Sequence, residues 1–177
     1  MTFCTVGCLL FFTIAVEEVY GTESKVEVTN LSVESDFPKG IRFSIAVESS
    51  DLVEEIKLTL RTGEQDTAIY EYFRFSPNKK VESELYWRTG TNSRYIPPGT
   101  TIKYQIEIST SNGFVDSRMQ EFLYLDSRFD WDMIRDRAVT VFYHGPVKSR
   151  AEEIMESIID TLDVMGPILG ASIDEPI

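Results

Sequence analysis

The clearest pattern along the chain is an alternation of apolar and polar side chains with a period of two residues. A period of two places successive side chains on opposite faces of a β-strand. The alternation recurs in residues 26–28, 41–47, 56–60, 70–75, 81–87, 102–108 and 119–124. The pattern therefore predicts seven half-buried strands, each with one face in a core.

Short segments rich in proline, glycine, asparagine and serine separate these runs. They are Pro38–Gly40, Ser49–Asp51, Thr62–Gly63, Ser76–Asn78, Gly90–Asn92, Pro97–Gly99 and Asn112–Gly113. Asn112–Gly113 favours a tight hairpin, because a primed turn needs positive φ at both central positions. Short strands joined by regular turns predict a mainly β fold over residues 24–126, a seven-stranded antiparallel sandwich of immunoglobulin or fibronectin type III kind. We expect Tyr104 to pack beside the Pro97–Gly99 corner.

The first 21 residues have a different composition. Phe3–Val16 carries no charge, and this run is too short to span a bilayer, which takes about 20 helical residues. Its length fits the apolar region of a signal peptide, so we expect residues 1–21 to be one and the product to be secreted or held at the cell envelope, on the extracellular side. Cys4 and Cys8 lie inside this segment, so the mature chain is expected to contain no cysteine.

The pattern changes again after the predicted sandwich. Residues 127–138 are interpreted as a linker, followed by a short strand, Val139–His144, and an amphipathic helix that ends at Gly166–Pro167. Ser149 and Glu152 have the spacing of a capping box. The apolar stripe of this helix consists of Ala151, Ile154, Met155, Ile158, Ile159 and Leu162. One strand is too narrow to cover such a stripe, so residues 139–177 are predicted to be a partial α/β start of a second domain, in a truncated chain.

The charge excludes one class of partner. The chain has 17 basic and 29 acidic residues, a formal net charge of −12, and no basic run. Nucleic-acid binding depends on clustered lysine and arginine side chains that displace counterions from phosphates. We therefore expect no nucleic-acid partner for this acidic protein.

Few residues offer candidate chemistry. His144 is the only histidine and lies at the end of a predicted strand, where a structural role is the simpler interpretation. Asp126, Asp130 and Asp132 could supply oxygen ligands to calcium, although their spacing matches no EF-hand loop. The sequence predicts no catalytic, cofactor-binding or metal-binding residue.

Two other features are open to a functional or a structural interpretation. Glu82 and Glu84 could act as paired carboxylates, but their alternation with Val81 and Leu85 is typical of the solvated side of a strand. An aromatic group could form a flat surface for a sugar or a peptide, although most of its members are expected in the core. This group consists of Tyr70, Tyr72, Phe73, Phe75, Tyr86, Trp87 and Tyr95.

Several segments together resemble the N-terminal region of exported bacterial proteins of the peptidase MA-like family, which are gluzincin-type zinc metallopeptidases. The segments are Asp36–Pro38 with Ile41–Phe43, Tyr95–Thr100 with Tyr104, Tyr124–Trp131, and Val139–Gly145 with the following helix. The resemblance implies a noncatalytic accessory β-sandwich in front of an incomplete peptidase domain. In that family, an H-E-x-x-H helix further along the chain binds zinc and activates water.

This chain has no H-E-x-x-H motif, so we expect it not to be an enzyme by itself and to hold no cofactor. Zinc is implied only for the missing catalytic part. The expected partner is the remainder of a peptidase domain. The alternative is an autonomous extracellular immunoglobulin-like module that binds a protein or a glycan.

Overall fold

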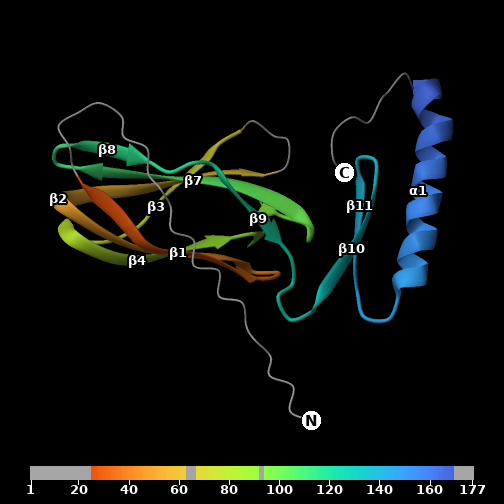
Figure 1. The fold of residues 1–177 in the computed structure, drawn as a ribbon, viewed down its shortest axis with the longest axis horizontal. Coiled ribbons are helices and arrows are strands. Elements are labelled where there is room, and N and C mark those ends of the chain that lie inside the picture. The colour runs from red at the N-terminus through yellow and green to blue at the C-terminus, as the bar shows by residue number, and fades with distance from the viewer. Residues whose placement is uncertain (1–24, 63–66, 92–93, 170–177) are drawn as a thin grey trace, which may run out of the picture. The chain divides into compact units, whose positions relative to one another are not determined.

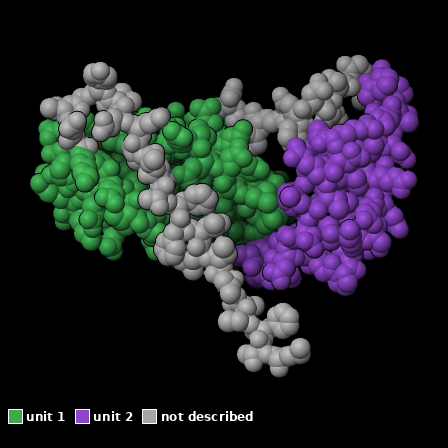
Figure 2. Space-filling view, viewed as in Figure 1, with its two compact units in different colours: residues 1–125 green, residues 126–177 purple. Residues whose placement is uncertain are grey.

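The structure, a computed structural model, describes residues 25–62, 67–91 and 94–169. The chain divides into two compact units, residues 1–125 and residues 126–177, which Figure 2 shows in different colours. The expected signal peptide, residues 1–21, lies outside the described residues, as do residues 170–177 of the expected second domain.

Antiparallel strands build the first unit (Figure 1). Its strands are β1 (Val26–Asp36), β2 (Gly40–Thr62), β3 (Ile69–Tyr72), β4 (Asn78–Arg88), β7 (Thr100–Thr110), β8 (Gly113–Asp116) and β9 (Gln120–Tyr124), with a short ribbon of β5 (Gly90–Thr91) and β6 (Arg94–Tyr95). The predicted mainly β class is confirmed, and the unit is a β-sandwich.

The long strand β2 belongs to both layers of the sandwich. Its first half pairs with β1 and β4, and its second half pairs with β3 and β7. Both of these changes of partner fall between Glu48 and Glu55, where the register shifts. The sequence predicted two strands here, because Ser49–Asp51 has the composition of a turn. The chain instead stays extended through these residues, and β7 continues the second layer by pairing with β8 and β9.

The alternating apolar residues form the core of the sandwich. On β2, Ile41, Phe43, Ile45 and Val47 are buried in the first half, and Ile56, Leu58 and Leu60 in the second. Val81, Leu85 and Trp87 of β4 and Ile102, Tyr104, Ile106 and Ile108 of β7 complete the main layers. The inward positions predicted from the alternation are confirmed on these strands.

Two buried tyrosines lie on the paired strands β7 and β9: Tyr104 lies at the Gln120 end of the pair, and Tyr124 lies at the end beside the Pro97–Gly99 turn. Tyr104 is buried, as expected, but its hydroxyl donates to Gln120 Oε1 at 2.7 Å across the β7–β9 pair. The corner itself is bonded to Tyr124, whose carbonyl oxygen accepts from the amide of Gly99 at 2.8 Å. The fully buried hydroxyl of Tyr124 lies 2.7 Å from Thr89 Oγ1. Tyr124 therefore ties the turn to the core.

The hairpin expected at Asn112–Gly113 is present, but its turn lies one residue earlier. Thr110 pairs with Gly113 across the β7–β8 hairpin, so Ser111 and Asn112 are the turn residues. Thr110 Oγ1 donates to the carbonyl of Gly113 at 3.0 Å and accepts from the amide of Asn112 at 3.3 Å. These bonds fix the turn without positive φ at Ser111 or Asn112, so the predicted primed turn was wrong.

The second unit is a hairpin covered by one helix. Its described part contains β10 (Trp131–Asp136), β11 (Val139–His144) and α1 (Lys148–Leu169). The sequence predicted a linker where β10 lies, because three of its six residues are charged at neutral pH and interrupt the alternation. Pairing with β11 stabilises this strand despite its composition.

The helix buries only a narrow stripe. Met155 and Ile159 form a small core with Val139 of β11, and Ala151 is also buried. The expected helix ends were wrong in detail: α1 begins before Ser149 and continues through Pro167 to Leu169. A proline in the last turn removes a single backbone donor, which a helix end tolerates better than a helix interior.

Gly40, at the start of β2, lies in a space too small for a side chain. A Cβ there would lie 2.6 Å from the carbonyl oxygen of Trp87 and 2.7 Å from the ring of Tyr86. We expect Gly40→Ala to lower the free energy of unfolding by about 1–3 kcal/mol, because the β2–β4 pair must move apart. Chemical denaturation measures the loss, with Ser44→Ala on the same strand as the control. A variant as stable as the parent would contradict the tight contact.

Candidate functional site

One row of side chains crosses the solvent face of the second sandwich layer. Tyr72 of β3 pairs with Lys57 of β2, Lys57 pairs with Glu107 of β7, and Glu107 pairs with Asp116 of β8. Residues directly opposite each other in a sheet share a face. Because Ile56 and Leu58 point into the core, this row points outward. The row is the best-defined polar arrangement on the sandwich.

Lys57 and Glu107 form an ion pair at the centre of the row. The ammonium nitrogen Nζ lies 2.6 Å from Glu107 Oε1, and both side chains are about a quarter exposed. The hydrogen bond to Glu107 raises the pKa of Lys57, so the ammonium stays charged. The pKa of Asp116 is raised, mainly because its carboxyl loses solvent and secondly because the negative charge of Glu107 is nearby. One cation thus lies beside two carboxylates.

The raised pKa of Asp116 predicts a pH-dependent gain on neutralisation. A carboxyl whose pKa is higher in the folded chain than in the unfolded chain destabilises the fold at any pH above the folded-state pKa, where it is ionised in both states. This destabilisation disappears below pH 3.8, the ordinary pKa, because the carboxyl is then protonated in both states. We expect Asp116→Asn to raise the melting temperature slightly at neutral pH and to leave it unchanged in acid below that value. Thermal melts of both proteins across this range make the measurement. A lower melting temperature at neutral pH would show that the carboxylate stabilises the fold.

The structure divides the aromatic group of the sequence analysis. Phe73 and Trp87 are buried, and Phe75 is partly buried against the core. Four tyrosines are exposed: Tyr70, Tyr72, Tyr86 and Tyr95. Tyr70 and Tyr72 lie two residues apart and so share the outer face of β3, next to the charged row. Together they form the aromatic end of this surface.

Asp126 has a structural partner. It is 5% exposed and accepts hydrogen bonds from the guanidinium of Arg128, one of them at 2.8 Å from Nε. This side-chain bond lowers the pKa of Asp126. Asp130 and Asp132 are exposed, and no cluster of potential metal ligands occurs in the part of the chain that the structure describes.

His144 lies in a small aromatic cluster at the end of β11. Its ring stacks on Phe129 with centroids 4.3 Å apart and an interplanar angle of 13°. Trp131 meets the same ring edge-on at 4.9 Å. The sequence did not indicate this cluster, although Trp131 lies two residues after Phe129. The β10–β11 register, which pairs Trp131 with His144, brings these rings together.

Glu82 and Glu84 lie on the outer face of β4. Both are exposed, and Glu84 accepts a 3.4 Å hydrogen bond from Arg42 of the neighbouring strand. This geometry matches the interpretation as a solvated strand face.

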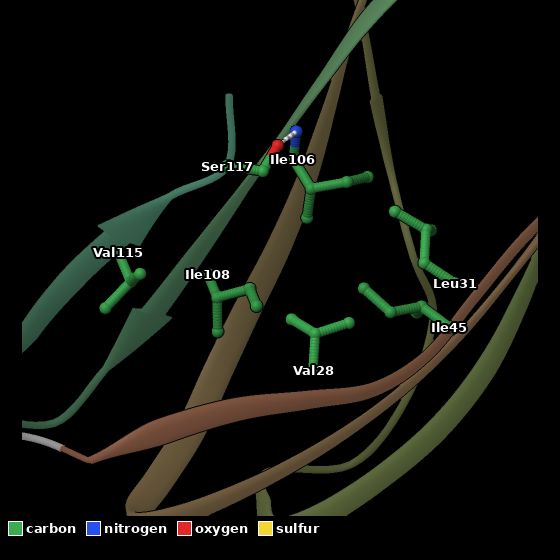
Figure 3. Close-up of a pocket in the computed structure, with 7 residues that line it drawn as sticks. All are labelled: Val28, Leu31, Ile45, Ile106, Ile108, Val115 and Ser117. Atoms are coloured by element: carbon green, nitrogen blue, oxygen red, sulfur yellow. Dashed lines mark hydrogen bonds between the residues drawn. The ribbon is translucent and has the colours of Figure 1, made fainter. Parts of the chain in front are cut away.

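A small cavity lies between the two layers of the sandwich (Figure 3). It is lined by Val28, Leu31, Ile45, Ile106, Ile108, Val115 and Ser117. Its volume is about 10 Å³, comparable to a single water molecule. The hydroxyl oxygen of Ser117 accepts a 2.8 Å hydrogen bond from the amide of Ile106 at its edge. The cavity is a packing gap, too small for an organic ligand.

Comparisons with known proteins gave no match: no family model, no curated protein and no solved structure resembles the chain significantly. No helix within the described ranges combines the length and the hydropathy needed to cross a membrane.

Proposed function

We propose that this chain is the noncatalytic accessory β-sandwich and the incomplete N-terminal part of an exported peptidase MA-like zinc metallopeptidase. In this proposal the sandwich positions the enzyme or its substrate outside the cell. The zinc, its ligands and the catalytic base belong to the missing part of the protein.

The observation that carries the proposal is the small core of the second unit. Among the residues that the structure describes, its core contains three buried residues, which lie between a two-stranded sheet and a single helix. Large apolar side chains along one flank of α1 stay exposed: Ile154 is 46% exposed, Met165 41% and Ile168 71%. A two-stranded sheet is marginal alone, and a stable domain packs each apolar face against another layer. The unit has the form of the first layer of a larger domain.

The nucleotide sequence beyond the codon for Ile177, together with the intact mass of the protein from its native host, tests the proposal. We expect an open frame that encodes H-E-x-x-H and a protein much heavier than 20.2 kDa. A stop codon at this point, with a native mass equal to that of the chain or its processed form, would overturn it.

The outer face of the sandwich favours a second candidate function, an extracellular immunoglobulin-like module that binds a glycan or a protein. Tyr70 and Tyr72 offer exposed rings for stacking, and the Lys57–Glu107 pair with Asp116 offers fixed donors and acceptors beside them. Binding sites commonly combine aromatic surface with a few placed polar groups.

Tyr72→Ala tests this second candidate. On a glycan array and in titrations with the glycans that bind, we expect the affinity of this variant to fall about tenfold or more, because a stacking ring is lost. Tyr95→Ala is the control, since Tyr95 is 67% exposed and lies outside the row. Equal affinities for the two variants would exclude the face as the binding site.

A further inference from the structure

We propose that the second unit binds an extended, basic polypeptide segment of another protein. This segment adds as a strand to β10, beside the acidic flank of α1 that Glu152, Glu156 and Asp160 form. This inference does not depend on the proposed function. The exposed apolar flank of α1, which contains Ile154, Met165 and Ile168, lies on the opposite side of the helix from the acidic flank, as the helical periodicity requires.

The site is an open groove between β10 and α1. Its volume is about 350 Å³, and its lining comes from Ile134, Asp136, Glu152, Met155, Glu156, Ile159 and Asp160. Met155 and Ile159 form an apolar floor and are only 7% and 8% exposed. No residue of β11 lines the groove, so it opens on the β10 side of the hairpin.

The backbone of β10 has a free edge on that side. Among the strands that the structure describes, β10 pairs only with β11. The loop contains just two residues, so Asp136 and Val139 form the hydrogen-bonded pair that closes the hairpin. Hydrogen-bonded and non-bonded positions alternate along an antiparallel pair, so the amides and carbonyls of Met133 and Arg135 point outward. These groups can bond an added strand, as in β-augmentation.

The charges around the groove identify the side chains of that strand. Glu152, Glu156 and Asp160 follow one another at intervals of four residues along α1, and Asp136 faces them from β10. Within the described residues, Asp136, Glu156 and Asp160 take part in no ion pair. A lysine or arginine facing α1 would lay its methylene stem over Met155 and place its cation among these carboxylates.

The other face of the added strand meets a different surface. Met133 is 64% exposed on the face of β10 that points away from the helix. Apolar residues at alternate positions of the incoming strand would cover Met133. The occupant is therefore a segment in which basic and apolar residues alternate, and the acidic charge of the whole chain, −12, favours its approach.

The test uses a capped peptide of alternating lysine and valine, six residues long like β10, titrated calorimetrically into the full chain. We expect saturable binding that weakens with salt and protects amides of β10 from hydrogen exchange. Three control peptides separate the contributions. Glutamate in place of lysine removes charge complementarity and is expected to abolish binding. N-methylation of the backbone at the lysines, or separately at the valines, blocks the hydrogen bonds of one of the two strand orientations, so one of these two peptides is expected to lose binding and the other to keep it.

Two matched variants locate the site. Glu156→Lys places a cation in the groove and is expected to lower peptide affinity about tenfold or more. Glu153→Lys makes the same change on α1 outside the groove lining and is expected to lower affinity only slightly. The helical circular dichroism signal shows that both variants fold. Each of three results would overturn the proposal: no binding by the lysine–valine peptide, equal binding by the two N-methylated peptides, or equal affinities of the two variants.

Discussion

Replacing Phe43 with alanine is expected to lower the free energy of unfolding of the β-sandwich by about 3–5 kcal/mol. Phe43 is 0% exposed in the first half of β2, and its ring meets Tyr104 edge-on with centroids 5.6 Å apart. Truncation removes the buried ring and its contact and leaves a cavity between the two layers, which the surrounding strands fill only in part. Chemical denaturation followed by tryptophan fluorescence measures this loss, because Trp87 is buried in the same core.

The control for this prediction is Tyr70→Ala. Tyr70 is 58% exposed on β3, so its removal is expected to change the stability by no more than about 0.5 kcal/mol. If Phe43→Ala cost as little as this control, the packing of the two layers described above would be wrong.

Replacing Ile159 with alanine is expected to unfold the second unit while the sandwich stays folded. Loss of a buried isoleucine costs about 2–5 kcal/mol, and a unit of this size with so small a core has little stability to lose. Within the described ranges, Val139 and Met155 are the other buried members of this core. Because α1 is the only helix in the described part of the chain, the far-UV circular dichroism signal of helix reports on this unit.

Ile154→Ala provides the matched control. Ile154 is on the same helix but is 46% exposed, so the helical signal and its melting temperature are expected to change little. A helical signal that survived Ile159→Ala would mean that contacts beyond the small core hold the helix in place.

The core of the sandwich was predictable because strand geometry links local sequence to burial. Ile41, Phe43, Ile45 and Val47 alternate with polar residues, and a strand that buries one of them buries all four. The helix stripe was predictable for the same kind of reason, since Met155 and Ile159 are one turn apart. Only part of the stripe is buried, because a two-stranded sheet is narrower than the stripe.

Apart from the exposed Tyr70 and Tyr72, which the aromatic group of the sequence includes, the candidate sites were not predictable from the sequence. The row of Tyr72, Lys57, Glu107 and Asp116 takes one residue from each of four strands, and only the pairing register brings them together. The groove beside α1 depends on β10, which the sequence pattern did not predict because charged residues interrupt its alternation. Local patterns specify which face of an element is apolar, whereas these sites depend on which elements become neighbours.

The continuity of β2 has a consequence for how the sandwich responds to tension. Because one covalent strand is hydrogen-bonded within both layers, a force that pulls the layers apart acts along the β2 backbone as well as on side-chain contacts. The layers are therefore unable to separate as independent sheets, because β2 is a central strand of both and is paired on both sides in each layer. Such a sandwich behaves as one mechanical element.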